Sequence, residues 1–178
     1  HRMTTTSASV IYPELPDPLT PGDLQQLFNP SFDERNWAPS IARRPETQVA
    51  LLVHLKIFQT IGRFLSVGDV PLAAIEYVAR KMAIESAVTL TCPIRTHYRH
   101  RHAILSRLKV SAWGAEGRAL ARATMCKTAR ARTDPADIMN SAIDALIRHD
   151  FELPPLATLR RLAGTWHSKT NTAQWAEE

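Results

Sequence analysis

The residues of this chain that suggest a chemistry first are its arginines and lysines, which are concentrated in one segment. Between residues 95 and 132, ten Lys/Arg residues accompany a single acid, Glu116. The ten are Arg95, Arg99, Arg101, Arg107, Lys109, Arg118, Arg122, Lys127, Arg130 and Arg132. A localised positive field attracts a polyanion and releases its counterions on binding. The segment therefore predicts a nucleic-acid contact, and a solvated helix face is the alternative interpretation.

The same segment contains residue types that bind zinc. Cys92, His97, His100 and His102 lie within eleven residues. Their spacing is not a standard zinc spacing, and no second pair of cysteines follows. We therefore interpret the histidines as structural or DNA-facing, and we expect no metal or other cofactor.

Catalytic chemistry finds little support in the sequence. Cys126 has no neighbour in sequence that would activate a thiol, and we expect it to be half-buried. No glycine-rich loop that could hold a phosphate is present. The paired acids at residues 33–34 indicate a helix surface and those at 177–178 a terminal tail, whereas metal-dependent strand transfer needs acids from several elements. We expect the chain not to be an enzyme.

Length and composition set the class of protein. The chain has 178 residues, 44% of them hydrophobic, and a formal net charge of +5. These values predict a globular protein with one domain or two small ones. No run approaches the roughly 18 apolar residues of a membrane span, and we recognise no signal peptide. His1 and Arg2 precede Met3, the expected initiator. Two cysteines fit a reducing cytoplasm, and a cationic membrane-surface helix competes with the nucleic-acid interpretation.

Proline marks helix starts in this sequence, and few runs alternate with the period of a strand. Thr20-Pro21 and Asp134-Pro135 each offer an N-cap followed by an N1 proline, and Gly62 and Gly164 stand where C-cap glycines belong. We predict an all-α fold with helices at about 21–28, 31–42, 46–61, 71–83, 94–108, 115–131, 135–148 and 155–167. The 46–61 helix should be the buried centre of the first half, and residues 88–92 should form an extended linker.

The helices are expected to form two subdomains. After an extended lead over residues 1–18, we predict a first subdomain at 19–88 and a second, strongly basic one at 89–167, followed by a polar tail at 168–178. The boundary is expected near residues 84–93. Each half has the size of a helix-turn-helix module of the centromere protein B or homeodomain type.

The order of several motifs resembles that of a known family. The motifs are Leu19-Thr-Pro-Gly-Asp-Leu-Gln-Gln-Leu-Phe, the stretch from Leu51 to Leu65 with its Gln59-Thr-Ile-Gly-Arg-Phe, the stretch from Val70 to Met82, His100-Arg-His-Ala-Ile-Leu, and the stretch from Ala142 to Leu162. In this order they resemble the N-terminal region of the Tn-three family of replicative transposases. The resemblance covers roughly residues 19–165, and the stretch from Leu55 to Phe64 is its most specific part.

That resemblance implies a helical region with tandem helix-turn-helix-like units that recognises the terminal inverted repeats of a transposon. It also implies that catalysis belongs to a metal-dependent acidic triad in a separate domain. The implied partners are double-stranded DNA and the rest of the transposase, with dimerisation through the full-length protein. The implied location is the bacterial cytoplasm, at the nucleoid.

The expected mechanism places one exposed helix of each half in a major groove, while other basic residues hold phosphates. The 94–108 helix is the best candidate, with one or two of Arg95, Arg99, Arg101 and Arg107 expected to contact bases. Arg118 and Arg122 should share one face of the 115–131 helix. Further phosphate contacts are predicted from Arg43, Arg44, Lys56 and Arg63. Two alternatives remain: a module that docks an acidic protein partner through its basic face, and RNA binding, for which no sheet-based motif is present.

Overall fold

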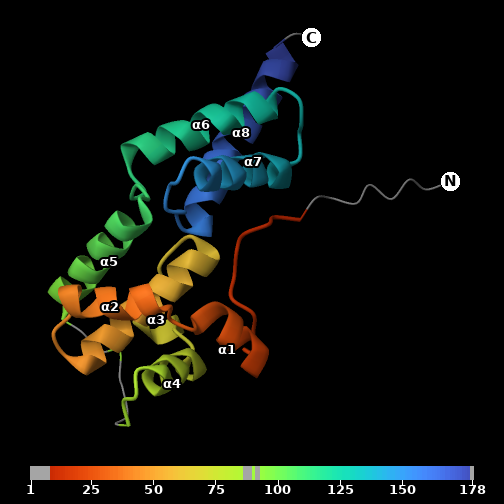
Figure 1. Ribbon diagram of the computed structural model, residues 1–178. Helices are drawn as coiled ribbons and strands as arrows, with labels where there is room; N and C mark the ends of the chain where they lie inside the picture. Colours follow the sequence, from red (N-terminus) through yellow and green to blue (C-terminus); the bar gives the residue numbers. More distant parts are fainter. Residues whose placement is uncertain (1–8, 86–89, 91–92, 177–178) are drawn as a thin grey trace. The chain divides into compact units, whose positions relative to one another are not determined.

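The computed structural model describes residues 9–85, Leu90 and residues 93–176, with the last ten of these described as backbone helix alone. Over these residues the secondary structure is helical, and the one β feature is an isolated bridge between Ser111 and Phe151. The helices, shown in Figure 1, are α1 Pro21–Phe28, α2 Phe32–Ile41, α3 Pro45–Ile61, a 3-10 turn at Val67–Asp69, α4 Leu72–Lys81, α5 Ile94–Leu108, α6 Ala115–Ala129, α7 Pro135–Arg148 and α8 Leu156–Ala176. The predicted all-α fold is confirmed.

Local signals at the helix ends account for most of the observed bounds. Thr20 accepts a hydrogen bond from the Asp23 amide at 3.1 Å and forms a capping box, and Asp134 accepts one from the Ala136 amide at 2.9 Å. Gly62 ends α3 in the left-handed region with φ 72°, which costs little without a Cβ. Gly164 was expected to end the last helix, but it lies inside α8, which continues through the predicted tail to Ala176.

The chain forms two compact units. One is a single stretch of sequence, and the other combines two stretches. The central unit is Pro13–Lys109, and the terminal unit combines His1–Tyr12 with Val110–Glu178. We predicted the boundary near residues 84–93, in front of α5. The structure instead assigns α5 to the central unit, because α5 contacts α2 and α3 and buries His100, Ile104 and Leu105. The linker predicted at 88–92 lies outside the described residues apart from Leu90.

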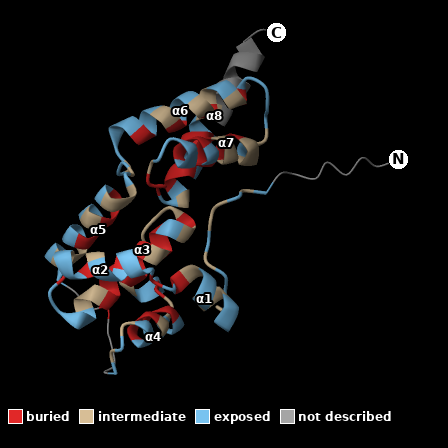
Figure 2. Cartoon of the chain, viewed as in Figure 1, coloured by how far each residue is buried: buried red, intermediate tan, exposed pale blue. Residues whose placement is uncertain are grey.

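The core of the central unit is organised around α3. This helix contacts α1, α2, α4 and α5, and ten of its seventeen residues are buried. Its apolar side chains surround the axis, so every side of the helix removes apolar surface from water. Figure 2 shows the resulting concentration of buried residues on α3. The prediction that the 46–61 helix is the buried centre of the first half is confirmed.

The terminal unit has an apolar core between α6, α7 and α8. Its fully buried side chains include Met125, Ile138, Leu146 and Leu159. The extended segment at residues 9–12 packs on this core through Val10 and Tyr12. Asn140 holds the same segment, because its side chain accepts a hydrogen bond from the Ile11 amide at 2.7 Å and donates one to the Ser9 carbonyl at 2.9 Å. Part of the predicted N-terminal lead thus completes the fold of the terminal unit.

Candidate nucleic-acid interface

The solvent-facing side of α5 carries a row of side chains that donate hydrogen bonds. Arg95, Arg99, His102 and Ser106 are all exposed, and their spacing of i, i+4, i+7 and i+11 places them on one face of a helix. We call these four residues the α5 row. Since no Asp or Glu occurs on α5, the row has no acid on its own helix to neutralise it.

The connection between α2 and α3 brings more positive charge to α5. Arg99 donates a hydrogen bond to the carbonyl oxygen of Ile41, at 3.0 Å, and so ties α5 to the end of α2. A pocket opens beside this bond, which we call the α3 pocket. Its lining includes Arg43, Arg44, Thr47, Thr96, Arg99 and His100. The structure therefore places Arg43, Arg44 and Arg99, which are far apart in sequence, around one concavity.

Two other predicted arginines of α5 lie over aromatic rings. The Arg107 guanidinium stands 4.9 Å from the centre of the Trp37 ring, and that of Arg101 stands 5.3 Å from the centre of the Phe64 ring. Such contacts are attractive and hold a guanidinium at a fixed place. Arg107 lies on the α2 side of the α5 row, with Trp37, Arg99 and His102 around one groove. Arg101 lies on a different side, so Arg99 and Arg101 do not point the same way.

Lys56 and Arg63 are less exposed than the arginines of the α5 row, and both have intramolecular partners. The Lys56 ammonium pairs with the Glu34 carboxylate at 2.6 Å, and the lysine side chain is 13% exposed. The Arg63 guanidinium donates to the carbonyl oxygen of Pro13 at 2.8 Å and is part-buried. A phosphate contact from either residue would compete with these bonds. We therefore leave both outside the candidate interface, although the sequence suggested them as phosphate contacts.

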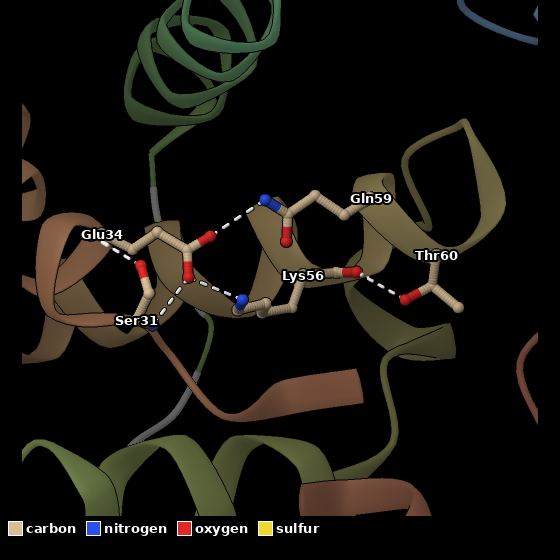
Figure 3. Close-up of polar contacts among 5 residues, drawn as sticks. All are labelled: Ser31, Glu34, Lys56, Gln59 and Thr60. Carbon is tan, nitrogen blue, oxygen red and sulfur yellow. Dashed lines mark hydrogen bonds and ion pairs between the residues drawn. The ribbon is translucent and has the colours of Figure 1, made fainter. Parts of the chain in front are cut away.

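Glu34 is the centre of the polar network around Lys56, shown in Figure 3. Its carboxylate accepts from the Ser31 amide at 2.7 Å, from Lys56 and from Gln59 at 2.9 Å. Burial alone would raise the pKa of this carboxyl, but the hydrogen bonds from Lys56, Ser31 and Gln59 outweigh it and hold the pKa below its usual value. The sequence suggested a surface role for the acids at 33–34. For Glu34, which is 5% exposed, that interpretation is wrong.

The stretch from Leu55 to Phe64, the most specific part of the resemblance to the Tn-three family, therefore serves the fold of the central unit. Lys56 and Gln59 bind Glu34, Gly62 supplies the left-handed turn, and the Phe64 ring packs at 4.8 Å from that of Phe58. These residues keep α2 and α3 together, and α2 and α3 in turn support α5. Their contribution to an interface is indirect.

The terminal unit presents a second group of basic residues on α6. Arg118 and Arg122, one turn apart, are both exposed, and Arg118 stands 5.6 Å from the centre of the Trp113 ring. Lys127 is also exposed but lies roughly 140° around the helix from Arg122. Lys109, at the C-terminal end of α5, is exposed with φ 56°. Arg118 and Arg122 share one side of α6, and Lys127 lies on another.

A group of three histidines lies between α3 and α5. His54 and His100 are 4% and 3% exposed, and the ring centre of His97 lies 5.6 Å from that of His54. Neither nitrogen of His54 has a hydrogen-bond partner, nor does Nδ1 of His100. Burial, together with the neighbouring His97, lowers the pKa of each of His54 and His100 to about 4. Both imidazoles are therefore neutral at pH 7.

These histidines are not arranged as a metal site. No group of three or more His, Cys, Asp or Glu residues that could hold a metal ion occurs within the described ranges. Cys92, which the sequence placed near them, lies outside those ranges. His102 is separate from the three because it is exposed on the α5 row. Cys126 is half-buried, as expected.

Comparison with known proteins identifies a family. A family model described as "Domain of unknown function (DUF4158)" matches residues 5–166. The chain belongs to this family. No curated protein and no solved structure matches the chain. The DUF4158 match includes residues of both units. Its description assigns no activity, and the relation to replicative transposases stays a prediction.

The candidate interface of this DUF4158 chain includes residues that were not predicted from the sequence. Ser106 completes the α5 row, and Thr47 and Thr96 line the α3 pocket. The spacing of 95, 99, 102 and 106 was visible as a helical row, but Thr47 and Thr96 are brought together by packing alone. Nor does any helix in the described part of the chain have the length and apolarity to cross a membrane.

Proposed function

We propose that this chain binds double-stranded DNA and recognises transposon terminal inverted repeats, as the N-terminal region of a Tn-three-like replicative transposase. The observation that carries the proposal is the acid-free α5 row, continued by Arg43 and Arg44 at the α3 pocket. The motif resemblance supplies the expected target. A partner with regularly spaced phosphates suits this arrangement, because several cations then meet several anions at once.

The α5 row also has the dimensions that base recognition needs. The major groove of B-DNA, about 12 Å wide, admits an α-helix. Arg95 and Arg99 can each offer paired donors to the O6 and N7 acceptors of guanine, while Arg43, Arg44 and Arg107 flank the helix where phosphates would run. We assign sequence reading to the α5 row and positioning to the flanking arginines.

The basic face of α6 has a simpler role in this proposal. Arg118, Arg122 and Lys127 add charge that attracts a phosphate backbone without reading its sequence. Two linked units then bind one long repeat more tightly than either alone, because binding of the first raises the effective concentration of the second.

We propose no catalytic activity for this chain. Strand transfer by such a transposase would belong to its separate metal-dependent domain, and this chain's partners would be DNA and the remainder of the transposase, in the bacterial cytoplasm. Dimerisation, if the transposase dimerises, would occur through the full-length protein.

A second candidate function is docking of an acidic protein partner. The observation that favours it is the pair of large apolar side chains at the start of α5, where Ile94 is 75% and Tyr98 is 70% exposed. Both line a pocket with Phe64, Leu65 and Arg101. Exposed apolar groups beside a cation are typical of protein interfaces. An acidic peptide with an apolar anchor would fit that site.

Fluorescence anisotropy with labelled duplexes tests the proposal. The chain should prefer a transposon-end inverted repeat to a scrambled duplex by about a thousandfold, and the preference should persist as salt rises. Arg95→Ala should reduce this preference for the inverted repeat. Arg80→Ala removes the same charge from an exposed position on α4 and is the matched control. Equal binding of both duplexes would mean that the interface contacts phosphates in general and does not recognise the sequence of the repeat. No binding at low salt would reject DNA and favour the acidic partner.

A further inference from the structure

The α3 pocket is built like a site for a tetrahedral oxyanion. It encloses about 390 Å³ at the point where α3 begins, and α5 forms its other wall. None of its lining residues is an acid. The nearest acid in sequence, Glu46, is exposed in the first turn of α3 and is not part of the lining.

The helix end that opens into the pocket has no capping side chain. Arg44 occupies the N-cap of α3 without a side-chain hydrogen bond to the backbone, as do the N-cap residues of α4, α5 and α6, whereas α1, α2 and α7 are each capped by a side chain. The first amides of a helix need acceptors, and the helix dipole adds partial positive charge there. An anion with several acceptor oxygens supplies what the missing cap does not.

Three guanidinium groups add charge from two sides of the pocket. Arg43 and Arg44 are exposed at the α2–α3 connection, and Arg99 comes from α5. The hydrogen bond from Arg99 to Ile41 at 3.0 Å fixes this side chain at the pocket wall. Because a guanidinium has five N–H donors, Arg99 can keep that bond and still donate to a ligand.

An independent observation comes from His100. Its side chain is 97% removed from solvent and lines the same pocket, and its Nδ1 has no hydrogen-bond partner. A buried polar atom without a partner lowers the stability of a fold, and each such atom in a native structure calls for an explanation. His100 also lines the neighbouring pocket with His54 and His97, and its Nδ1 is fully buried, so in the tautomer with the proton on Nδ1 this atom would donate to an oxygen in the α3 pocket only after the imidazole ring turns.

We infer that the α3 pocket is a phosphate site that holds one backbone phosphate of bound DNA. The site itself follows from the geometry of the pocket, and the choice of DNA as the source of the phosphate rests on the proposed function. One phosphate held between α3 and α5 would fix the register of the α5 row on the duplex. It would therefore act on sequence recognition without touching a base.

The first arm of the test uses inorganic phosphate and the whole chain. Amide chemical shifts of Thr47 and Gln48 should move in a saturable way with phosphate and with sulfate, and not with chloride at equal ionic strength. Arg44→Ala should weaken this binding about tenfold or more, a single charge-assisted contact being typically of that size. Arg80→Ala, which removes an exposed arginine of α4 that does not line the pocket, should leave phosphate binding unchanged. His100→Phe removes the Nδ1 donor and should also weaken phosphate binding. Because Arg44 is exposed, the Arg44→Ala result does not depend on a substitution in the core.

The second arm uses DNA in which single phosphates are replaced by neutral methylphosphonates across the inverted repeat. At one position of the repeat, this replacement should lower the DNA affinity of the unaltered chain about tenfold. The same replacement should not lower the DNA affinity of the Arg44→Ala variant any further. In Arg95→Ala, the same replacement should keep its full effect.

The outcomes separate the inference from the proposed function. Anion binding together with one coupled phosphate supports both. DNA binding without any phosphate coupled to Arg44, or without anion-dependent shifts at Thr47 and Gln48, overturns the inference and leaves DNA binding intact. Anion binding by a chain that does not bind DNA overturns the proposed function and the DNA source, and makes the pocket a site for free phosphate or a phosphorylated partner.

Discussion

The central and terminal units both expose arginines, but they hold them in different ways. In the central unit, Arg43, Arg44 and Arg99 surround a pocket, and Arg99 is fixed by a bond to another helix. In the terminal unit, Arg122 and Lys127 are exposed on different sides of α6. Fixed donors on a concave surface can select one arrangement of acceptors, whereas mobile charges on a convex helix attract any polyanion. The basic residues of the central unit are therefore predicted to contribute more to sequence specificity than those of the terminal unit.

The two units also differ in what they bury. The central unit buries an acid and two histidines, Glu34, His54 and His100. The terminal unit buries apolar side chains such as Met125 and Ile138 and one acid, Glu152, whose carboxylate accepts a hydrogen bond from the Trp113 amide at 3.1 Å. Buried ionisable groups are stable only in one protonation state or with a partner. Among the described residues, the buried histidines that lack hydrogen-bond partners belong to the central unit, so acid should destabilise that unit more than the terminal unit.

The largest expected effect is the loss of the Glu34 network. Glu34→Ala removes the acceptor of Lys56, Gln59 and the Ser31 amide, and should destabilise the central unit by about 3 kcal/mol, because Lys56 is left without its counterion. Hydrogen exchange should rise in α2 and α3 and stay unchanged in α6 and α7. Asp33→Ala, at the exposed neighbouring acid, is the control. A uniform rise in exchange over both units would mean that they do not unfold separately.

The next effect compares arginines of the two units on DNA. Arg99→Ala should reduce binding of the cognate repeat by about 2 kcal/mol, or roughly thirtyfold, and binding of scrambled DNA by less, because scrambled DNA loses only the phosphate contact at the α3 pocket. Arg122→Ala should weaken both duplexes alike and lower the salt slope by about one. Anisotropy over a salt series measures both quantities. If the two variants behave alike, the distinction between fixed and mobile arginines fails.

Acid should lower the stability of the central unit. Burial lowers the pKa of His54 and His100 from 6.5 to about 4 in the folded chain. Because unfolded histidines bind protons at a higher pH than these buried ones, stability is complete above pH 6.5 and declines as the pH falls toward 4. Urea unfolding followed by hydrogen exchange should show this decline in α3 and α5. His54→Leu should reduce the decline, since it removes one of the two groups. An equal decline in α6 and α7 would contradict the assignment to these histidines.

The smallest effect concerns Lys109, which ends α5 with a positive φ. A side chain in the left-handed region is strained, so Lys109→Gly should stabilise the chain by about 1 kcal/mol. The same change removes a predicted phosphate contact and should lower the salt slope of DNA binding by about one. Thermal unfolding and anisotropy measure the two consequences separately. A stabilised variant with an unchanged salt slope would exclude Lys109 from the interface.

Much of the fold could be predicted from the sequence because its signals are local. Caps such as Thr20 and Asp134 require two or three neighbouring residues, and the apolar pattern of α3 is visible along a single helix. The end of α8 was missed because Gly164 is compatible with both a helix interior and a C-cap. The unit boundary was missed because the polar composition of α5 conceals the side that His100, Ile104 and Leu105 bury.

The candidate site was predictable only in part. The exposed arginines of α5 and α6 follow from charge and helical spacing. The roles of Lys56 and Arg63 do not, because their partners Glu34 and Pro13 lie 22 and 50 positions away. The α3 pocket likewise depends on Ile41 meeting Arg99 across 58 positions. Such long-range contacts follow from packing, which a helical pattern does not specify.

The position of residues 9–12 has a consequence for synthesis on the ribosome. This segment leaves the ribosome early, yet it packs on Asn140 of α7 and, through the Tyr12 hydroxyl, on the carbonyl of Pro154. The central unit, complete at Lys109, can fold while α6 to α8 are still being added, since domains generally fold as units during synthesis. Residues 9–12 therefore reach their final packing only after α7 and Pro154 have been translated.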